Sequence, residues 1–148
     1  VYGIGDFKNG SIRAIDKDIL ERLEFRKKRV LDIGCGRGEA LKYAIEHGAE
    51  EVVGIDFSED AVAITRDYLK QFNLAGTIYC ADETEQVQQW SASTPTPVFD
   101  IVIMFDCVEH IPRKELSVLL TFLHKLLCPC GIVAVNTPVY LCGQRCAC

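Results

Sequence analysis

The stretch VLDIGCGRGE at residues 30–39 decides the predicted fold. Its first four residues, 30–33, form a short apolar run that is typical of a buried strand. Three glycines then recur at every second position, Gly34, Gly36 and Gly38. A helical stretch follows over 39–46, with Gly48 placed to terminate it. The sequence therefore predicts a strand, a glycine-rich turn and a helix in succession.

The same unit of strand and helix repeats along the chain. We expect further strands at 51–57, 77–81, 100–105 and 131–136. Helices are expected at 59–72, with Ser58 as N-cap, and at 83–90. Two more helices are expected where apolar residues recur at helical spacing. The first apolar stripe is Ile12, Ile15, Ile19, Leu20 and Leu23, and the second is Leu116, Leu119, Leu120, Leu123 and Leu127. Strands that alternate with helices form a parallel sheet covered on both faces. The predicted fold is α/β, a Rossmann-like doubly wound sheet in three αβα layers.

Composition sets limits on the function. The 148 residues fit one domain, 1–148, and 49% hydrophobic residues are enough for a packed core. The net charge of -5 disfavours a broad grip on nucleic-acid phosphates, which requires clustered Lys and Arg. No leader-like segment and no apolar run of roughly 20 residues is present, so we expect a cytoplasmic protein without a membrane partner.

Eight cysteines are distributed unevenly. Cys35, Cys80 and Cys107 fall in or beside predicted strands, where we expect small buried hydrophobic side chains. The other five lie near the end: Cys128, Cys130, Cys142, Cys146 and Cys148. Their spacings match none of the paired C-x2-C zinc sites, so zinc is the less favoured interpretation.

The glycine turn indicates where a ligand would bind. In open parallel sheets ligands bind beyond the carboxyl ends of the strands, where the strand order reverses. The spacing G-x-G-x-G differs from the G-x-G-x-x-G of dinucleotide sites, and Glu39 at the helix start would repel phosphate. A ligand without phosphates is favoured, although a glycine turn alone is equally compatible with an ordinary connection.

Polar and aromatic residues follow the next two strands. Asp56 ends the second strand and can accept hydrogen bonds from two vicinal ribose hydroxyls. Phe57 can pack on an adenine ring, with a plain core contact as the alternative. Asp82 can accept from an adenine amino group or cap the helix that begins at Glu83.

Five segments resemble, in order, the motifs of class I S-adenosylmethionine-dependent methyltransferases. They are 30–39, 53–58, 81–82, 99–112 and 127–138. The resemblance implies that the cofactor is S-adenosylmethionine. It further implies that the methionine portion is lined by Asp32 and by the loop of Gly34, Cys35 and Gly36. By the same resemblance Asp56 binds the ribose, Asp82 contacts the adenine, and Phe105 and Asp106 flank the donor. DCVEHIP and the later NTP are most similar to the branch that methylates small molecules. An RNA acceptor is the alternative, because small-RNA terminal methyltransferases have related patterns.

The segment 106–110, DCVEH, carries a further hypothesis. Some relatives bind a divalent ion there that orients acceptor hydroxyls, which makes Asp106, Glu109 and His110 candidate metal ligands. His110 is alternatively a catalytic base without metal. The remaining interpretation is that Glu109 and His110 are structural, around the next helix start.

The resemblance also implies two further strands, one of them antiparallel. The sequence stops about a dozen residues after the fifth predicted strand, so we expect it to lack these strands. Two rival functions follow: a non-catalytic S-adenosylmethionine-binding module, and an NAD-binding oxidoreductase domain. The motifs specify neither the acceptor nor the oligomeric state.

Overall fold

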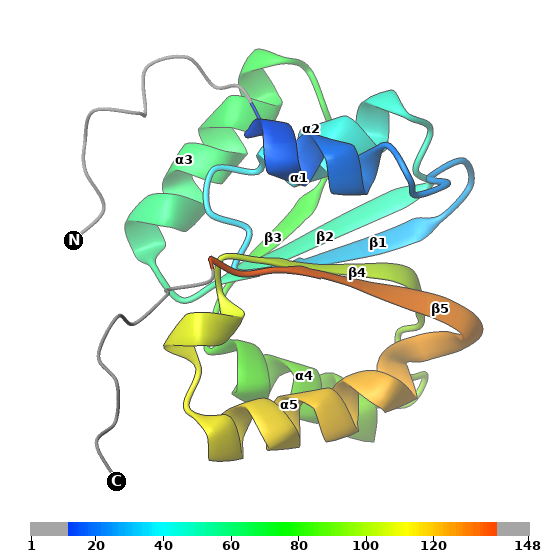
Figure 1. Ribbon diagram of the computed structural model, residues 1–148, viewed down its shortest axis with the longest axis vertical. Coiled ribbons are helices and arrows are strands. Elements are labelled where there is room, and N and C mark those ends of the chain that lie inside the picture. The colour runs from blue at the N-terminus through cyan, green and yellow to red at the C-terminus, as the bar shows by residue number, and fades with distance from the viewer. Residues whose placement is uncertain (1–11, 139–148) are drawn as a thin grey trace, which may run out of the picture.

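Five parallel strands form one sheet in the computed structural model, which describes residues 12–138. The strands are β1 (Arg29–Ile33), β2 (Glu51–Asp56), β3 (Thr77–Cys80), β4 (Phe99–Phe105) and β5 (Leu127–Asn136). Their order across the sheet is β3-β2-β1-β4-β5, with every adjacent pair parallel. Figure 1 shows the sheet edge-on between two layers of helices.

The helices divide between the two faces of the sheet. On one face lie α1 (Ala14–Leu20), α2 (Glu39–Glu46) and α3 (Glu59–Gln71), and on the other α4 (Glu83–Ala92) and α5 (Arg113–Leu126) (Figure 1). A short 3-10 turn, η2 (Val108–His110), joins β4 to α5. The arrangement confirms the predicted three-layer, doubly wound α/β fold.

Successive side chains of the central strands point to opposite faces and build two separate cores. Val30 packs in the core beneath α1, α2 and α3, and Leu31 in the core above α4 and α5. Ile103 and Met104 on β4 divide in the same way, and all four side chains are fully buried. This burial on both faces explains why these strands are continuous apolar runs in the sequence.

The strand order reverses at β1. Its neighbours are β2 on one side and β4 on the other, so the chain first builds outward to β3 and then crosses back. The carboxyl ends of β1, β2 and β4 therefore gather at one edge of the sheet, where the predicted ligand site lies.

Several elements differ from the sequence predictions. β5 begins at Leu127 rather than 131, because the backbone of Leu127 is already extended where α5 ends. Cys80 is exposed rather than buried, since β3 is the edge strand of the described sheet. In the two predicted helix stripes, Ile15 is 55% exposed and Leu120 45% exposed. Cys142, Cys146 and Cys148 lie outside the described residues.

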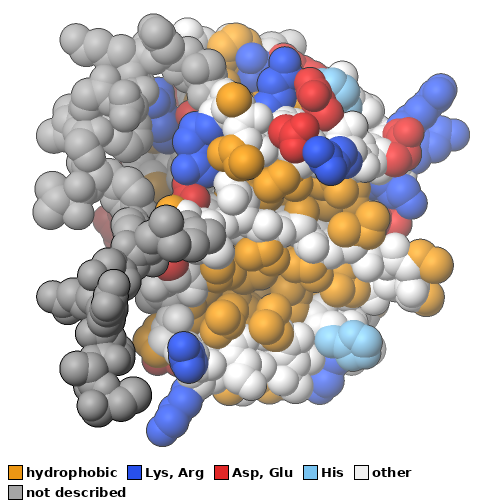
Figure 2. All heavy atoms as spheres, in the orientation of Figure 1, with side chains coloured by type: hydrophobic (Ala, Val, Ile, Leu, Met, Phe, Trp, Pro, Cys, Tyr) orange, Lys and Arg blue, Asp and Glu red, His pale blue; other side chains and the backbone are white. Residues whose placement is uncertain are grey.

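The outer edge at β5 presents apolar side chains. Ile132 and Val135 are each about half exposed, at 48% and 47%. Figure 2 shows apolar side chains gathered across the middle of the view, over the region that β5 crosses in Figure 1. None of the described helices is both long and apolar enough to cross a bilayer.

Two adjacent leucines on α5 test this packing. Leu119 is fully buried and Leu120 is 45% exposed. We expect Leu119→Ala to lower the free energy of unfolding by about 2–5 kcal/mol, because it leaves a cavity between α5 and the sheet. Leu120→Ala, the matched control, should change it by less than about 0.5 kcal/mol. Urea unfolding measures both, and equal losses would contradict the assigned orientation of α5.

Candidate functional site

The glycine loop between β1 and α2 is held against the end of β2. The amides of Gly34 and Cys35 both donate to the carbonyl oxygen of Ile55, at 2.8 and 3.0 Å. Gly34 and Gly38 adopt positive φ angles of 70° and 78°, which favour glycine. A Cβ atom on Gly34 would lie 2.8 Å from that of Cys107, so the loop packs too closely for any side chain there.

Asp56 joins the end of β2 to the centre of this loop. Its Oδ2 atom accepts from the Gly36 amide at 3.0 Å, and its Oδ1 atom accepts from the Ser58 amide at 2.9 Å. The Thr65 hydroxyl on α3 donates to the carbonyl oxygen of Gly36. Ser58 caps α3 as predicted, accepting from the Ala61 amide at 3.3 Å. Both backbone groups of Gly36 are thus fixed by side chains.

Asp32, at the end of β1, lies in a strongly negative environment. It is only 3% exposed. Burial, followed by the negative charges of Glu39, Asp56 and Asp16, raises its pKa well above the ordinary value for Asp. A cation bound at this edge of the sheet would offset these charges.

Two thiols beside the loop have a raised pKa, which disfavours the nucleophilic thiolate form. Burial, and after it the charge of Asp32, raises the pKa of both Cys35 and Cys107. The Cys35 side chain packs in the core next to Gly54. Only the backbone of Cys35 therefore belongs to the loop surface, and its carbonyl oxygen accepts from the Gly38 amide at 2.8 Å.

The other predicted cofactor residues occupy different settings. Phe57 is 74% exposed just beyond β2 and could cover a flat ring. Asp82 caps α4, accepting from the Glu85 amide at 2.9 Å, so the capping alternative of the sequence analysis is confirmed. Phe105 is partly buried at the end of β4 and packs against the core beneath α1 to α3.

Asp106 belongs to a network that sequence reasoning missed. Its φ angle is 49°, and its amide donates to the carbonyl oxygen of Asn136 at 2.8 Å. Its carboxylate pairs with Arg13, which also donates to Asp16 through Nε and Nη2 at 2.6 and 2.9 Å. Asn136 donates to Asp16 at 2.7 Å. The only sequence signal was a carboxylate, Asp16, inside an apolar helical stripe.

One atom of this network lacks a hydrogen-bond donor. Oδ1 of Asp106 is buried, and no donor among residues 12–138 reaches it. A buried carboxylate oxygen without a donor carries a free-energy cost of about 1–3 kcal/mol or more. A ligand that presents an N–H group at this point would remove that cost.

The three candidate metal ligands do not form one group. Asp106 pairs with Arg13, whereas Glu109 accepts from the Thr137 hydroxyl at 2.9 Å. His110 lies on the exposed side of η2, with its Nε2 atom 4.0 Å from Glu109. Across residues 12–138, no three His, Cys, Asp or Glu side chains are placed to hold a metal ion.

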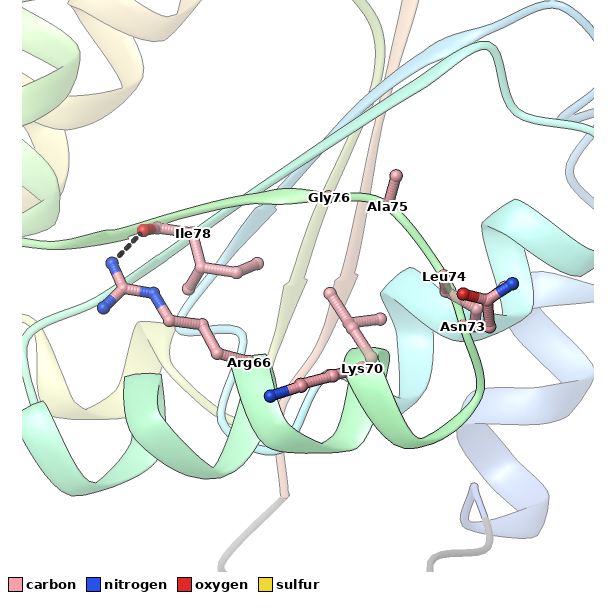
Figure 3. A pocket seen from close by; sticks show the side chains of 8 residues that line it. Arg66, Lys70, Asn73, Leu74, Ala75, Gly76 and Ile78 are labelled. Carbon is pink, nitrogen blue, oxygen red and sulfur yellow. Dashed lines mark hydrogen bonds between the residues drawn. The ribbon is translucent and has the colours of Figure 1, made fainter.

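A separate cavity of about 300 Å³ lies between the end of α3 and the start of β3. Figure 3 shows Arg66 reaching across to β3, where its guanidinium donates to the carbonyl oxygen of Ile78 at 2.7 Å. None of the predicted site residues lines this cavity. It is distinct from the edge formed by the carboxyl ends of the strands.

The chain belongs to the methyltransferase-domain family, which matches residues 9–145. This match covers nearly the whole chain and confirms the resemblance to class I S-adenosylmethionine-dependent methyltransferases. S-adenosylmethionine is the cofactor of that class.

Individual relatives agree with this assignment. A ubiquinone biosynthesis O-methyltransferase from Neisseria meningitidis is 30% identical over 135 residues, 90% of this chain and 54% of that protein. Its namesake from Azoarcus sp. is 35% identical over 62% of this chain and 36% of its own length. A solved S-adenosylmethionine-dependent methyltransferase from Archaeoglobus fulgidus is 25% identical with a TM-score of 0.68, covering 84% of this chain and 52% of that one. The chain thus spans about half, or less, of these relatives.

The raised pKa of Asp32 predicts how the stability of the protein depends on pH. In the folded state the pKa of Asp32 lies above the ordinary value near 3.8, which applies to the unfolded state. At pH values between these two pKa values, the folded state therefore binds more protons than the unfolded state. The free energy of unfolding contributed by Asp32 should therefore fall as pH rises through this window. We expect Asp32→Asn to remove that fall. Urea unfolding across a pH series measures it, and parallel pH profiles for the two proteins would contradict the assignment.

Proposed function

We propose that the protein containing this chain transfers the methyl group of S-adenosylmethionine to a small-molecule acceptor, with residues 1–148 as its donor-binding domain. The observation that carries the proposal is the set of carboxylates around the glycine loop at the switch point. Asp32, Asp56 and Asp106 lie at or just beyond the carboxyl ends of three neighbouring strands. Such a site favours a cationic ligand over a phosphate-bearing one.

Three features fit this donor in particular. Its sulfonium and ammonium charges suit a site where burial, and after it the charges of neighbouring carboxylates, raise the pKa of Asp32. Its ammonium group is also the kind of donor that Oδ1 of Asp106 lacks. Its adenine ring offers a flat surface to the exposed face of Phe57.

The chain's own residues would divide the work of binding. Gly34 keeps the floor of the loop free of side chains. Asp56 would accept from the ribose hydroxyls, exchanging or sharing its bonds to the Gly36 and Ser58 amides. Arg13 is the cation placed at the end of β4, half exposed, and would meet the donor's carboxylate.

Positioning would supply most of the rate acceleration. When bound, S-adenosylmethionine would supply a methyl group activated on its sulfonium sulfur, and in-line displacement by the acceptor would release S-adenosylhomocysteine as the leaving group. The residues at the ends of β1, β2 and β4 would hold donor and acceptor in a fixed geometry, which is how alignment lowers a barrier of this kind. Burial raises the pKa of Cys35 and Cys107, so neither thiol would take a covalent part.

The small-molecule acceptor is supported by the ubiquinone biosynthesis O-methyltransferases among the relatives. An RNA acceptor and a non-catalytic module stay alternatives that the sequence leaves open. The cytoplasmic location stays a prediction. An NAD-binding function is disfavoured because Glu39 stands at the start of α2, where a pyrophosphate would need the helix amides.

Binding experiments test the proposal. By isothermal titration calorimetry, the full-length protein should bind S-adenosylhomocysteine and not NAD. Asp56→Ala should weaken that binding by about 2–3 kcal/mol, because it removes a charged acceptor. Asp60→Ala, which removes an exposed carboxylate from the first turn of α3, should have no effect. Unchanged affinity in a folded Asp56→Ala protein, or binding of NAD alone, would overturn the assignment.

The hypotheses about η2 need a separate test. Asp106 is paired with Arg13 and the three candidate ligands are dispersed, so we expect activity to survive exhaustive chelation. If His110 is a base or contacts the acceptor, His110→Ala should lower kcat by about 10²-fold or more. Turnover with labelled donor measures both. Loss of activity on chelation, restored by Mg²⁺ or Mn²⁺, would reinstate the metal hypothesis.

A further inference from the structure

The carboxylate of Asp16 makes three hydrogen bonds in a place where a helix would normally bury an apolar side chain. Arg13 donates to it twice, and Asn136 donates once at 2.7 Å. Asp16 is only 7% exposed, although it lies in the short helix α1. Burying a carboxylate is costly unless hydrogen bonds compensate, and here three hydrogen bonds compensate for the burial.

These bonds connect parts of the chain that are distant in sequence. Asn136 ends β5 and lies 120 residues from Asp16. The carbonyl oxygen of Asn136 also accepts from the amide of Asp106, which in turn pairs with Arg13. Hydrogen bonds and an ion pair therefore connect these residues in a closed network across α1, β5 and the end of β4. This network, called the circuit below, consists of Arg13, Asp16, Asp106 and Asn136.

The circuit holds Arg13 in one orientation. Two parallel bonds to Asp16 fix the plane of the guanidinium, which is the geometry that restricts an Arg side chain most. Without them, a side chain that is 51% exposed would sample many rotamers. The bonds to Asp16 also raise the pKa of Arg13, so the group stays charged.

We propose that Asp16 is a positioning residue of the donor site: it ties Arg13 to Asn136 and so presents the guanidinium, already oriented, to the carboxylate of the donor's amino-acid portion. The inference rests on the proposed function, since it requires S-adenosylmethionine to be the ligand. Its action is indirect, because Asp16 acts through Arg13. Preorganisation of this kind lowers the entropy lost on binding.

Two ligands separate this role from a general effect on folding. S-adenosylhomocysteine carries the amino-acid portion, whereas 5′-methylthioadenosine has the same nucleoside and thioether without it. In the full-length protein, Asp16→Asn should weaken S-adenosylhomocysteine about tenfold and 5′-methylthioadenosine by less than about twofold. Titration calorimetry on both ligands gives the comparison.

The same helix offers a matched control. Asp18 also loses a charge on substitution by Asn, yet its partner is the exposed Arg22 at 2.9 Å, away from the circuit. Asp18→Asn should leave both affinities unchanged. If Asp16→Asn does not fold, Asn136→Ala replaces it, because it removes one of the three bonds and should show the same selective loss to a smaller extent.

The outcomes are distinct. An equal loss for both ligands, or no loss for either in a folded variant, would overturn the positioning role while leaving the proposed function intact. A wild-type protein that binds 5′-methylthioadenosine as tightly as S-adenosylhomocysteine would also overturn it. If wild-type protein binds neither ligand, the proposed function itself fails.

Discussion

The candidate site depends on the two hydrogen bonds that the carboxylate of Asp56 accepts. This carboxylate accepts from the amide of Gly36 in the loop and from the amide of Ser58 at the start of α3. Through these two bonds, one side chain at the end of β2 fixes both the loop after β1 and the start of α3. The Thr65 hydroxyl completes the arrangement from α3 by donating to the carbonyl oxygen of Gly36. The chain's own groups therefore fix the shape of the loop.

This construction concentrates negative charge at one edge of the sheet. Asp32 is buried near Glu39, Asp56 and Asp16, and its pKa rises in consequence. Repulsion among these carboxylates lowers the stability of the folded protein, and a cationic ligand would reduce it. The same charges would thus favour S-adenosylmethionine over ligands that bear phosphate.

Much of the fold could be predicted from the sequence because its strands are buried on both faces. Continuous apolar runs such as 101–104 have few alternatives, and the glycines at 34, 36 and 38 mark a turn that side chains would obstruct. Less predictable were the positions set by tertiary packing. Cys80 is exposed because β3 is an edge strand, and α5 ends at Leu126 because the chain turns directly into β5.

The candidate site also contains residues that the sequence could predict and residues that depend on tertiary contacts. Asp32, Gly34, Gly36 and Asp56 could be found because they end adjacent strands or form the turn between them. The sequence could not identify Arg13, Asp16 and Asn136 as site residues. The hydrogen bond between Asp16 and Asn136 joins residues 120 positions apart, and such a separation forms no recognisable motif. Asp82 had two interpretations in sequence, and only the structure shows its carboxylate capping α4. Local motifs thus identify the loop, whereas the circuit around Arg13 emerges only from the folded chain.

A crystal structure of the full-length protein with S-adenosylhomocysteine tests the central claim most directly. The account predicts the ligand's sulfur beside the loop from Gly34 to Gly36 and its ribose hydroxyls within hydrogen-bond distance of Asp56. Ligand density elsewhere, for example in the cavity between α3 and β3, with the Asp56 carboxylate making no contact to it, would contradict the account.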